Sequence, residues 1–286
     1  MTEAELAVVR RAFAMQVLAA VGVVAPRIEA AFATVRREAF LGAGPWQIFR
    51  WGMAYRATPS ADPVYLYTDD VVGIWPERKI NNGQPSLHAN LINQAAPAAG
   101  EHVVHIGTGA GYFTAILSQL GGRVTGLEFE PILVQRSREN LAEYSNVTIV
   151  EGDGASTAFE PADVIYVNAG ATRPADNWLD RLRDGGRLIL PLTTDKGFGQ
   201  FGCAPHEMVT QGAVLRIERR GDDFFVKSIS AVAIYPCAGA RDEASEKALT
   251  TALAGGRLNE VTRLYRHDVP DEDCWLKAPG WSLAYR

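Results

Sequence analysis

Between residues 85 and 192, short apolar segments alternate with amphipathic ones, and this alternation limits the folds open to the chain. The apolar segments have the length of buried strands and lie at 103–106, 124–127, 147–151, 164–168 and 187–192. The helical patterns that precede or separate them lie at 85–95, 113–120, 131–144 and 178–183. Strands that are apolar along their length and alternate with helices are typical of a parallel sheet covered on both faces. We therefore predict a Rossmann-like α/β fold.

The flanking parts of the chain follow other patterns. Residues 1–40 read as two helices, and residues 42–82, rich in Gly, Pro and aromatic side chains, as irregular structure with a small hairpin. After the sheet we expect an antiparallel meander at 213–219, 224–227 and 229–235, a helix at 243–254 and a polar, irregular tail. The predicted organisation is an N-terminal cap over the site, a nucleotide-binding domain and a C-terminal extension, at 1–84, 85–240 and 241–286.

Charge and cysteine content narrow the functional classes. The formal net charge of -5 provides no basic footprint for a nucleic-acid backbone. Cys203, Cys237 and Cys274 are widely spaced and form no CxxC pair, so we expect neither a disulfide framework nor a metal site. A reducing cytoplasm fits this usage best. No apolar run is long enough to span a membrane.

The pair Arg10-Arg11 precedes an apolar run, a pattern that also occurs in export signals. Apolar residues nevertheless recur at helical spacing, at Leu6, Val9, Phe13 and Val17. Thr2 and Glu5 add a capping box. We therefore interpret the segment as an amphipathic core helix.

A glycine-rich turn, Gly107-Thr108-Gly109-Ala110-Gly111, lies between a predicted strand and a predicted helix. In an open α/β sheet this is where a nucleotide binds, because glycines let the backbone approach the ligand and the helix N-terminus favours an anion. Taken alone the motif is weak, since close helix–strand packing also requires small residues. Tyr112 occupies the place of the third glycine of the dinucleotide motif, which argues against a dehydrogenase.

Acidic residues follow the next two strands. Glu128 ends one strand seventeen residues past Gly111, where a carboxylate can accept both ribose hydroxyls, and Asp153-Gly154 ends the next. A surface carboxylate is the alternative for each residue separately. Because all three features fall at the carboxyl ends of consecutive strands, we predict a shared nucleotide-type site.

With these motifs in this order, the chain resembles the protein-L-isoaspartate O-methyltransferase family from about Val23 to Gly239. The matching elements are Arg37-Glu38-Ala39-Phe40, Gln84-Pro85 with Ala89, Ile106 to Tyr112, Glu128, Gly152-Asp153-Gly154, Gly185 to Pro191 and Ala233 to Pro236. The glycine motif is general to methyltransferases, whereas Gln84-Pro85 upstream of it is specific to this family. The resemblance implies a class I methyltransferase fold with a mostly parallel seven-stranded-type sheet, and S-adenosyl-L-methionine as cofactor.

The resemblance also implies roles for single residues. Gly107, Thr108, Gly109 and Gly111 would hold the methionine part of the cofactor, Glu128 the ribose, and Asp153 with Gly154 the adenine. The other candidates for cofactor contact are His88, His105, Tyr112, Phe129 and Asn168. The candidates beside the transferring methyl group are Asn82, Gly83 and Gln84. No metal ligand is expected.

Two positions depart from the family pattern. Gly83 stands where the family has a serine beside the methyl group, and His105 stands where an acidic residue is usual. An amide of Asn81 or Asn82 could replace the serine hydroxyl, while Gly83 could simply allow the loop to turn. On this basis we expect slow methylation of isoaspartyl peptides and a several-fold gain on Gly83→Ser. A buried structural role is the alternative for His105.

Three functions remain open from the sequence. The first is carboxyl O-methylation of isoaspartyl residues in proteins or peptides, which needs no general base because a carboxylate is ionised at neutral pH. The second is methylation of another small-molecule or peptide acceptor on the same fold; a base would then be needed, for which His88, His105 and Asp70 are weak candidates. The third is a cofactor-binding protein without isoaspartyl activity.

Overall fold

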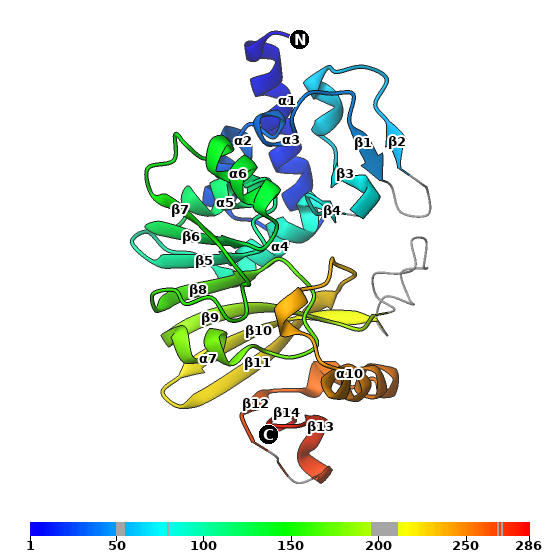
Figure 1. The fold of residues 1–286 in the computed structure, drawn as a ribbon. Coiled ribbons are helices and arrows are strands. Elements are labelled where there is room, and N and C mark those ends of the chain that lie inside the picture. Colours follow the sequence, from blue (N-terminus) through cyan, green and yellow to red (C-terminus); the bar gives the residue numbers. More distant parts are fainter. Residues whose placement is uncertain (50–54, 79, 196–210, 268, 270) are drawn as a thin grey trace. The chain divides into compact units, whose positions relative to one another are not determined.

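The computed structural model of the chain describes residues 1–49, 55–78, 80–195, 211–267, 269 and 271–286 (Figure 1). Contacts among these residues form two compact units, a first unit of residues 1–103 and 108–151 and a second unit of residues 104–107 and 152–286. Strand β5 (His102–Ile106) contributes to both. The three-segment organisation expected from the sequence rests on other criteria and stays a prediction.

The first unit contains several α-helices. They are α1 (Glu3–Ala19), α2 (Pro26–Thr34), α3 (Glu38–Leu41), α4 (Pro85–Ala95), α5 (Tyr112–Ser118) and α6 (Pro131–Asn140). A proline opens α2, α4 and α6, where its missing N–H costs no hydrogen bond. The predicted capping box of Thr2 and Glu5 is confirmed, and Phe13 and Val17 are buried on the inner face of α1.

The aromatic-rich segment contains more regular structure than predicted. Its strands β1 (Gln47–Phe49), β2 (Arg56–Ala57), β3 (Val71–Trp75) and β4 (Ile80–Asn81) form a four-stranded sheet in the order β2-β1-β3-β4. The 3₁₀ helices η1 (Pro63–Leu66) and η2 (Pro76–Arg78) connect them. A small core of Trp46, Leu66, Val72 and Leu41 supports the sheet. Trp51 lies outside the described residues.

The first unit also holds one side of the main sheet. Strand β6 (Arg123–Glu128) pairs in parallel with β7 (Val147–Glu151), in a register that sets Glu128 opposite Glu151. This parallel pairing is the arrangement predicted from the apolar segments. It places Glu128 at the carboxyl end of its strand.

The first strands and the first helix of the second unit are β8 (Ala162–Val167), α7 (Asp176–Arg181), β9 (Leu182–Thr193), β10 (Gly212–Arg220) and β11 (Asp223–Ala231). With β5 these strands have the order β11-β10-β9-β8-β5. Strands β8 and β9 are parallel, whereas β9, β10 and β11 pair antiparallel. The antiparallel meander is therefore confirmed, but the two strands expected at 224–227 and 229–235 are one strand, β11.

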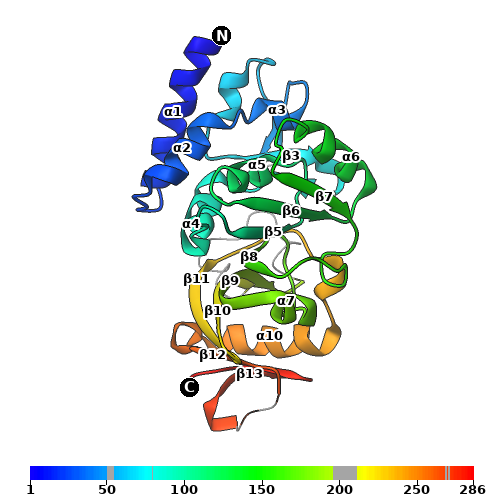
Figure 2. The same ribbon diagram turned by 90° about the vertical axis from the view of Figure 1, so that its left-hand side faces the viewer.

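The expectation of a polar, irregular tail is wrong. After the 3₁₀ helix η3 (Ala238–Ala240), the extension forms α10 (Glu243–Gly255), η4 (Leu258–Glu260), β12 (Arg263–Tyr265), η5 (Asp271–Asp273), β13 (Cys274–Ala278) and β14 (Trp281–Ala284). Strand β12 pairs with β11, so the sheet exceeds the seven-stranded type. Burial of Trp275 and Trp281 supplies the apolar core that the polar composition concealed. Figure 2 shows α10 alongside β13.

A membrane-spanning helix must be both long and apolar. Among the residues that the structure describes, no helix combines the length and the apolar character needed to cross a bilayer.

Candidate cofactor-binding site

The glycine turn after β5 has three glycines in the left-handed region. The φ angles of Gly107, Gly109 and Gly111 are 77°, 56° and 97°. A Cβ atom on Gly111 would lie 2.8 Å from Leu141 Cδ1, and one on Gly107 would lie 3.2 Å from the carbonyl oxygen of Asn168. Backbone conformation and close packing thus both require glycine here.

The Glu128 carboxylate is hydrogen-bonded to this turn. Its Oε2 accepts a hydrogen bond of 2.7 Å from the Gly109 N–H, and its Oε1 accepts from the N–H groups of Phe129 and Glu130 at 3.0 and 3.1 Å. Burial raises the pKa of Glu128, and the backbone donors oppose that rise. A carboxylate has about four lone-pair sites. Three are used, so about one remains for a ligand hydroxyl, fewer than the two predicted from the sequence.

The segment before α4 is held by a single carboxylate. Asp69 accepts hydrogen bonds from Gln84 Nε2 at 3.0 Å, from the Ser86 N–H at 2.7 Å and from Ser86 Oγ at 2.6 Å. A carboxylate at the first turn of a helix also stabilises the positive end of the helix dipole. Gln84, a catalytic candidate from the sequence, is therefore held by Asp69.

The side chain of His88 lies directly beside Gly83. The φ angle of Gly83 is 75°, and a Cβ atom there would lie 2.2 Å from His88 Nε2. His88 is 1% exposed and stacks on Phe113, with ring centroids 3.6 Å apart and an interplanar angle of 18°. The imidazole thus fills the position that a side chain on residue 83 would take.

Asn82 is buried between the small sheet and Arg37. Its Oδ1 accepts from the Val72 N–H at 3.0 Å and from Arg37 Nη2 at 3.4 Å. Its Nδ2 is buried and has no hydrogen-bond partner among the described residues. An amide with a spare donor at this point is the group that the sequence suggested for contact with an acceptor oxygen.

Asp153, Gly154 and Asn168 lie in the second unit. Asp153 Oδ1 accepts from the Ala155 N–H and its Oδ2 from Ser156 Oγ, both at 3.0 Å. Asn168 Nδ2 donates to the Gly107 carbonyl oxygen at 3.4 Å. A Cβ atom on Gly154 would lie 2.3 Å from Ile106 Cγ2, so only glycine fits against the end of β5.

Comparison with known proteins identifies the family. The sequence model of Protein-L-isoaspartate(D-aspartate) O-methyltransferase matches residues 11–202. A Protochlamydia amoebophila protein-L-isoaspartate O-methyltransferase is 34% identical over 179 residues, which cover 61% of this chain and 76% of the relative. A Rhodopseudomonas palustris relative is 32% identical over 183 residues, covering 63% and 75%. In the Brucella anthropi relative, the match spans only 61% of the protein.

The chain belongs to the protein-L-isoaspartate O-methyltransferase family. It is accordingly an S-adenosylmethionine-dependent methyltransferase.

Two solved structures resemble this chain and show that it has the class I methyltransferase fold. One, a protein-L-isoaspartate O-methyltransferase, has a TM-score of 0.62 at 23% identity and covers 79% of this chain and 65% of that one. The other, from Plasmodium falciparum and solved with S-adenosyl-L-homocysteine, has a TM-score of 0.58 at 18% identity and covers 80% and 97%.

The residues present fit the cofactor of this family. Thr108 to Gly111 and the spare acceptor site of Glu128 lie in the first unit, and two buried polar atoms of that unit, Thr108 Oγ1 and Asn82 Nδ2, have no partner among the described residues. Unsatisfied buried groups are costly unless a ligand or water satisfies them. Phe129, 57% exposed beside Glu128, offers an apolar face.

Tyr112 packs among aromatic side chains. It is 2% exposed and its ring packs edge-on against those of Phe32, Phe40 and Phe113. These contacts are those of a core residue, and its role in cofactor binding stays a prediction.

Three residues that contact these candidates received no role from the sequence. Asp69 anchors Gln84 and Ser86, as described. Arg37, fully buried, donates to the carbonyl oxygens of Leu66, Thr68 and Asp70, and burial lowers its pKa. Gly239 lies so close to Asp153 that a Cβ atom would be 2.0 Å from the carboxylate. For Arg37 the sequence offered one signal, the family motif Arg37-Glu38-Ala39-Phe40. The contacts of all three residues join positions distant in sequence, so local sequence does not reveal them.

His105 has the surroundings of a core histidine. It is fully buried in β5, edge-on to Tyr166 with ring centroids 5.5 Å apart. Burial lowers its pKa to about 3. The imidazole is therefore neutral at pH 7, and contact with the cofactor, predicted from its position, is less favoured than a packing role.

The lowered pKa of His105 makes stability depend on pH. Below the ordinary value of about 6.5 the unfolded chain binds a proton that the folded chain refuses until about pH 3. Stability should therefore fall as pH drops through this window, by at most about 1.4 kcal/mol per pH unit from this group. Urea unfolding at several pH values should show a shallower fall for His105→Leu. An unchanged slope would contradict the burial of this imidazole.

Proposed function

We propose that this chain methylates the free carboxylate of isoaspartyl residues in proteins or peptides, with S-adenosyl-L-methionine as methyl donor. The observation that carries the proposal is the family match over residues 11–202, which contains the glycine turn, Glu128, Asp153 and the segment 81–88. The net charge of -5 gives no support for a nucleic-acid acceptor.

The chemistry suits a site without a general base. When bound, S-adenosyl-L-methionine supplies an activated sulfonium methyl group. The carboxylate acceptor, with an ordinary pKa of about 4, is ionised at neutral pH. The protein must therefore hold the acceptor in line with the methyl group and exclude water, which is catalysis by proximity and orientation.

In this proposal the candidate residues bind the cofactor or position the acceptor. The glycine turn would receive the methionine part of the cofactor, Glu128 one ribose hydroxyl, and Asp153 the adenine. Asp69 fixes the start of α4 through Gln84 and Ser86. The Asn82 amide would then donate to an acceptor oxygen.

A second candidate function has its own support. Gly83 lacks the side chain that the family carries there, and the imidazole of His88 fills the space instead. A dedicated small-molecule or peptide acceptor on the same fold would account for this change.

Transfer from radiolabelled S-adenosyl-L-methionine distinguishes the two functions. The chain is incubated with an isoaspartyl peptide or with the matching aspartyl peptide, and base-labile methyl groups are collected as methanol. We expect slow, isoaspartyl-dependent release of methanol. Base-stable product on another acceptor would favour the second function, and cofactor binding without turnover of either peptide would contradict the isoaspartyl function.

A further inference from the structure

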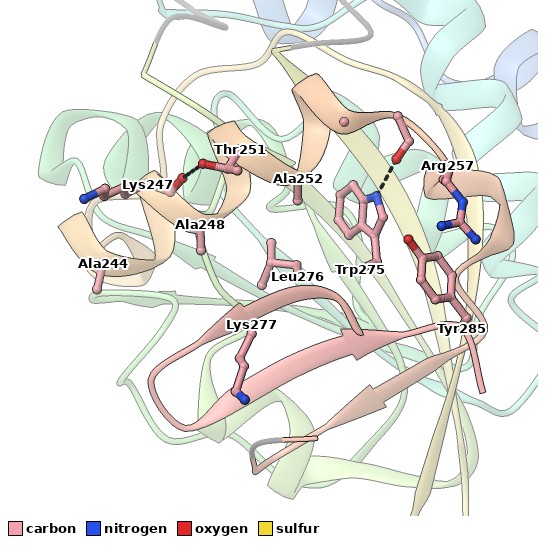
Figure 3. A pocket seen from close by; sticks show the side chains of 12 residues that line it. Ala244, Lys247, Ala248, Thr251, Ala252, Arg257, Trp275, Leu276, Lys277 and Tyr285 are labelled. Atoms are coloured by element: carbon pink, nitrogen blue, oxygen red, sulfur yellow. Dashed lines mark hydrogen bonds between the residues drawn. The ribbon is translucent and has the colours of Figure 1, made fainter. Parts of the chain in front are cut away.

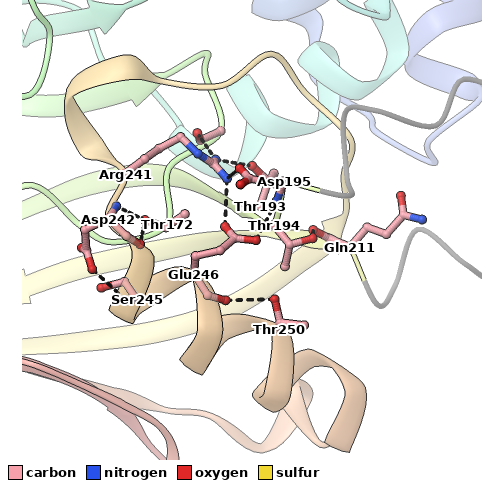
Figure 4. Close-up of polar contacts among 11 residues, drawn as sticks. Thr172, Thr193, Thr194, Asp195, Gln211, Arg241, Asp242, Ser245, Glu246 and Thr250 are labelled. Carbon is pink, nitrogen blue, oxygen red and sulfur yellow. Dashed lines mark hydrogen bonds and ion pairs between the residues drawn. The ribbon is translucent and has the colours of Figure 1, made fainter.

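The C-terminal extension is firmly attached to the rest of the second unit. Figure 4 shows Arg241 between two carboxylates, with Nη2 2.6 Å from Asp195 Oδ1 and 2.9 Å from Glu246 Oε2. At the start of α10, the Ser245 N–H donates to Asp242 Oδ1 at 2.8 Å. These contacts fix α10 to the end of β9 and give it a defined position.

Two tryptophans join α10 to the final hairpin. Trp281 Nε1 donates to Ser245 Oγ at 3.1 Å, and Trp275 Nε1 donates to the Gly256 carbonyl oxygen at 2.6 Å. Both rings are buried. The space between α10 and β13 is consequently bordered by fixed elements on two sides.

A groove of about 630 Å³ lies in this space (Figure 3). We call it the C-terminal groove; it is lined by Ala244, Lys247, Ala248, Thr251, Ala252, Gly255, Gly256, Arg257, Trp275, Leu276, Lys277 and Tyr285. Small residues on α10 leave room above a floor of Trp275 and Leu276. Its volume lies in the range of about 300–1,000 Å³ found for ligand sites.

The charges of the C-terminal groove all have one sign. Its lining includes Lys247, Arg257 and Lys277 and no acidic residue, although the chain as a whole carries -5. Lys247 forms no ion pair within the part of the chain that the structure describes. Lys277 pairs with Asp271 at 3.0 Å and Arg257 with Glu260 at 2.8 Å. Exposed pairs of this kind contribute little and can exchange for a ligand carboxylate.

The groove is open, which favours an extended ligand. Seven of its twelve lining residues are exposed. Small-molecule sites instead bury most of their ligand. It also lies beyond residues 11–202, the part matched by the family model, so it is no part of the shared site.

We propose that the C-terminal groove binds an acidic segment of the methyl-accepting polypeptide. Carboxylates of that segment pair with Lys247, Lys277 and Arg257, and an apolar side chain packs on Trp275. This inference rests on the proposed function in one respect, that the acceptor is a polypeptide.

Binding of a labelled peptide tests the groove without turnover. The probe is a fluorescein-labelled 15-residue peptide rich in Asp and Glu with one Phe, titrated with full-length protein and followed by fluorescence anisotropy. We expect Lys247→Gln/Lys277→Gln to bind it at least fivefold more weakly than the native protein, and added NaCl to weaken native binding. Lys227→Gln, a matched removal of an exposed charge on β11, should bind as the native protein does.

Kinetics separate the groove from the transfer site. For an isoaspartyl peptide with an acidic flank, the double variant should raise KM and leave kcat unchanged, and a short isoaspartyl peptide should show neither change. Groove-dependent binding without methylation would uphold the groove and contradict the isoaspartyl function. Equal binding by native protein and double variant, no preference over a basic peptide, or self-association that depends on these lysines in place of peptide binding would each overturn the inference.

Discussion

Glu128→Ala should weaken S-adenosyl-L-homocysteine binding by roughly 10- to 150-fold. The carboxylate accepts three backbone hydrogen bonds, including the one from Gly109 that shapes the turn, and has about one acceptor site left for ribose. Hydrogen bonds to charged groups contribute about 1.5–3 kcal/mol each, and 1.4 kcal/mol is tenfold in affinity. Calorimetric titration measures the loss directly.

Glu151→Ala provides the matched control for this experiment. Glu151 is exposed and lies opposite Glu128 in the parallel register of β6 and β7. Its removal should change cofactor affinity less than twofold. Glu128→Gln keeps one carbonyl acceptor and should fall between native protein and Glu128→Ala. Native-like affinity of Glu128→Ala, with its melting temperature preserved, would mean that the ribose binds elsewhere.

The fold was predictable where local sequence features mark the start, the end or the apolar face of an element. Helix α4 and strand β7 have the predicted bounds, because proline opens the first and a continuous apolar run defines the second. The final hairpin was not predicted, because the charged segment 266–273 before it made the whole tail look polar and concealed the short apolar runs of β13 and β14. Its strand β14 pairs with β12, which in turn pairs with β11, a strand distant in sequence.

For the site, sequence identified residue types but not their partners. Gly107, Gly111 and Glu128 lie where the strand-end argument placed them. The bonds of Asp69 to the start of α4 join residues up to seventeen positions apart through a carboxylate with no local signal. The close approach of His88 to Gly83 depends on side-chain packing, which sequence spacing does not reveal. The effect expected of Gly83→Ser changes because of this contact.

Gly83→Ser should reduce stability and activity, contrary to the gain expected from the family pattern alone. A Cβ atom at residue 83 would lie 2.2 Å from His88 Nε2 and 2.8 Å from its Cδ2, and the φ angle is 75°. Left-handed backbone costs about 1–2 kcal/mol for a residue with a Cβ atom, and displacement of the stacked imidazole adds to that cost. Urea unfolding and the methanol assay measure both losses.

The pair Gly83→Ser/His88→Ala tests the cause. Removing the imidazole makes room for the serine, so the two substitutions should be non-additive by at least about 1 kcal/mol, as expected for residues in contact. The double variant should also methylate an isoaspartyl peptide several-fold faster than His88→Ala alone. Gly185→Ser is the control for backbone strain, because Gly185 has a φ angle of 72° and nothing within 4 Å of its Cβ position. If Gly83→Ser costs no more than Gly185→Ser, or if the two effects simply add, His88 does not determine which side chain residue 83 can carry.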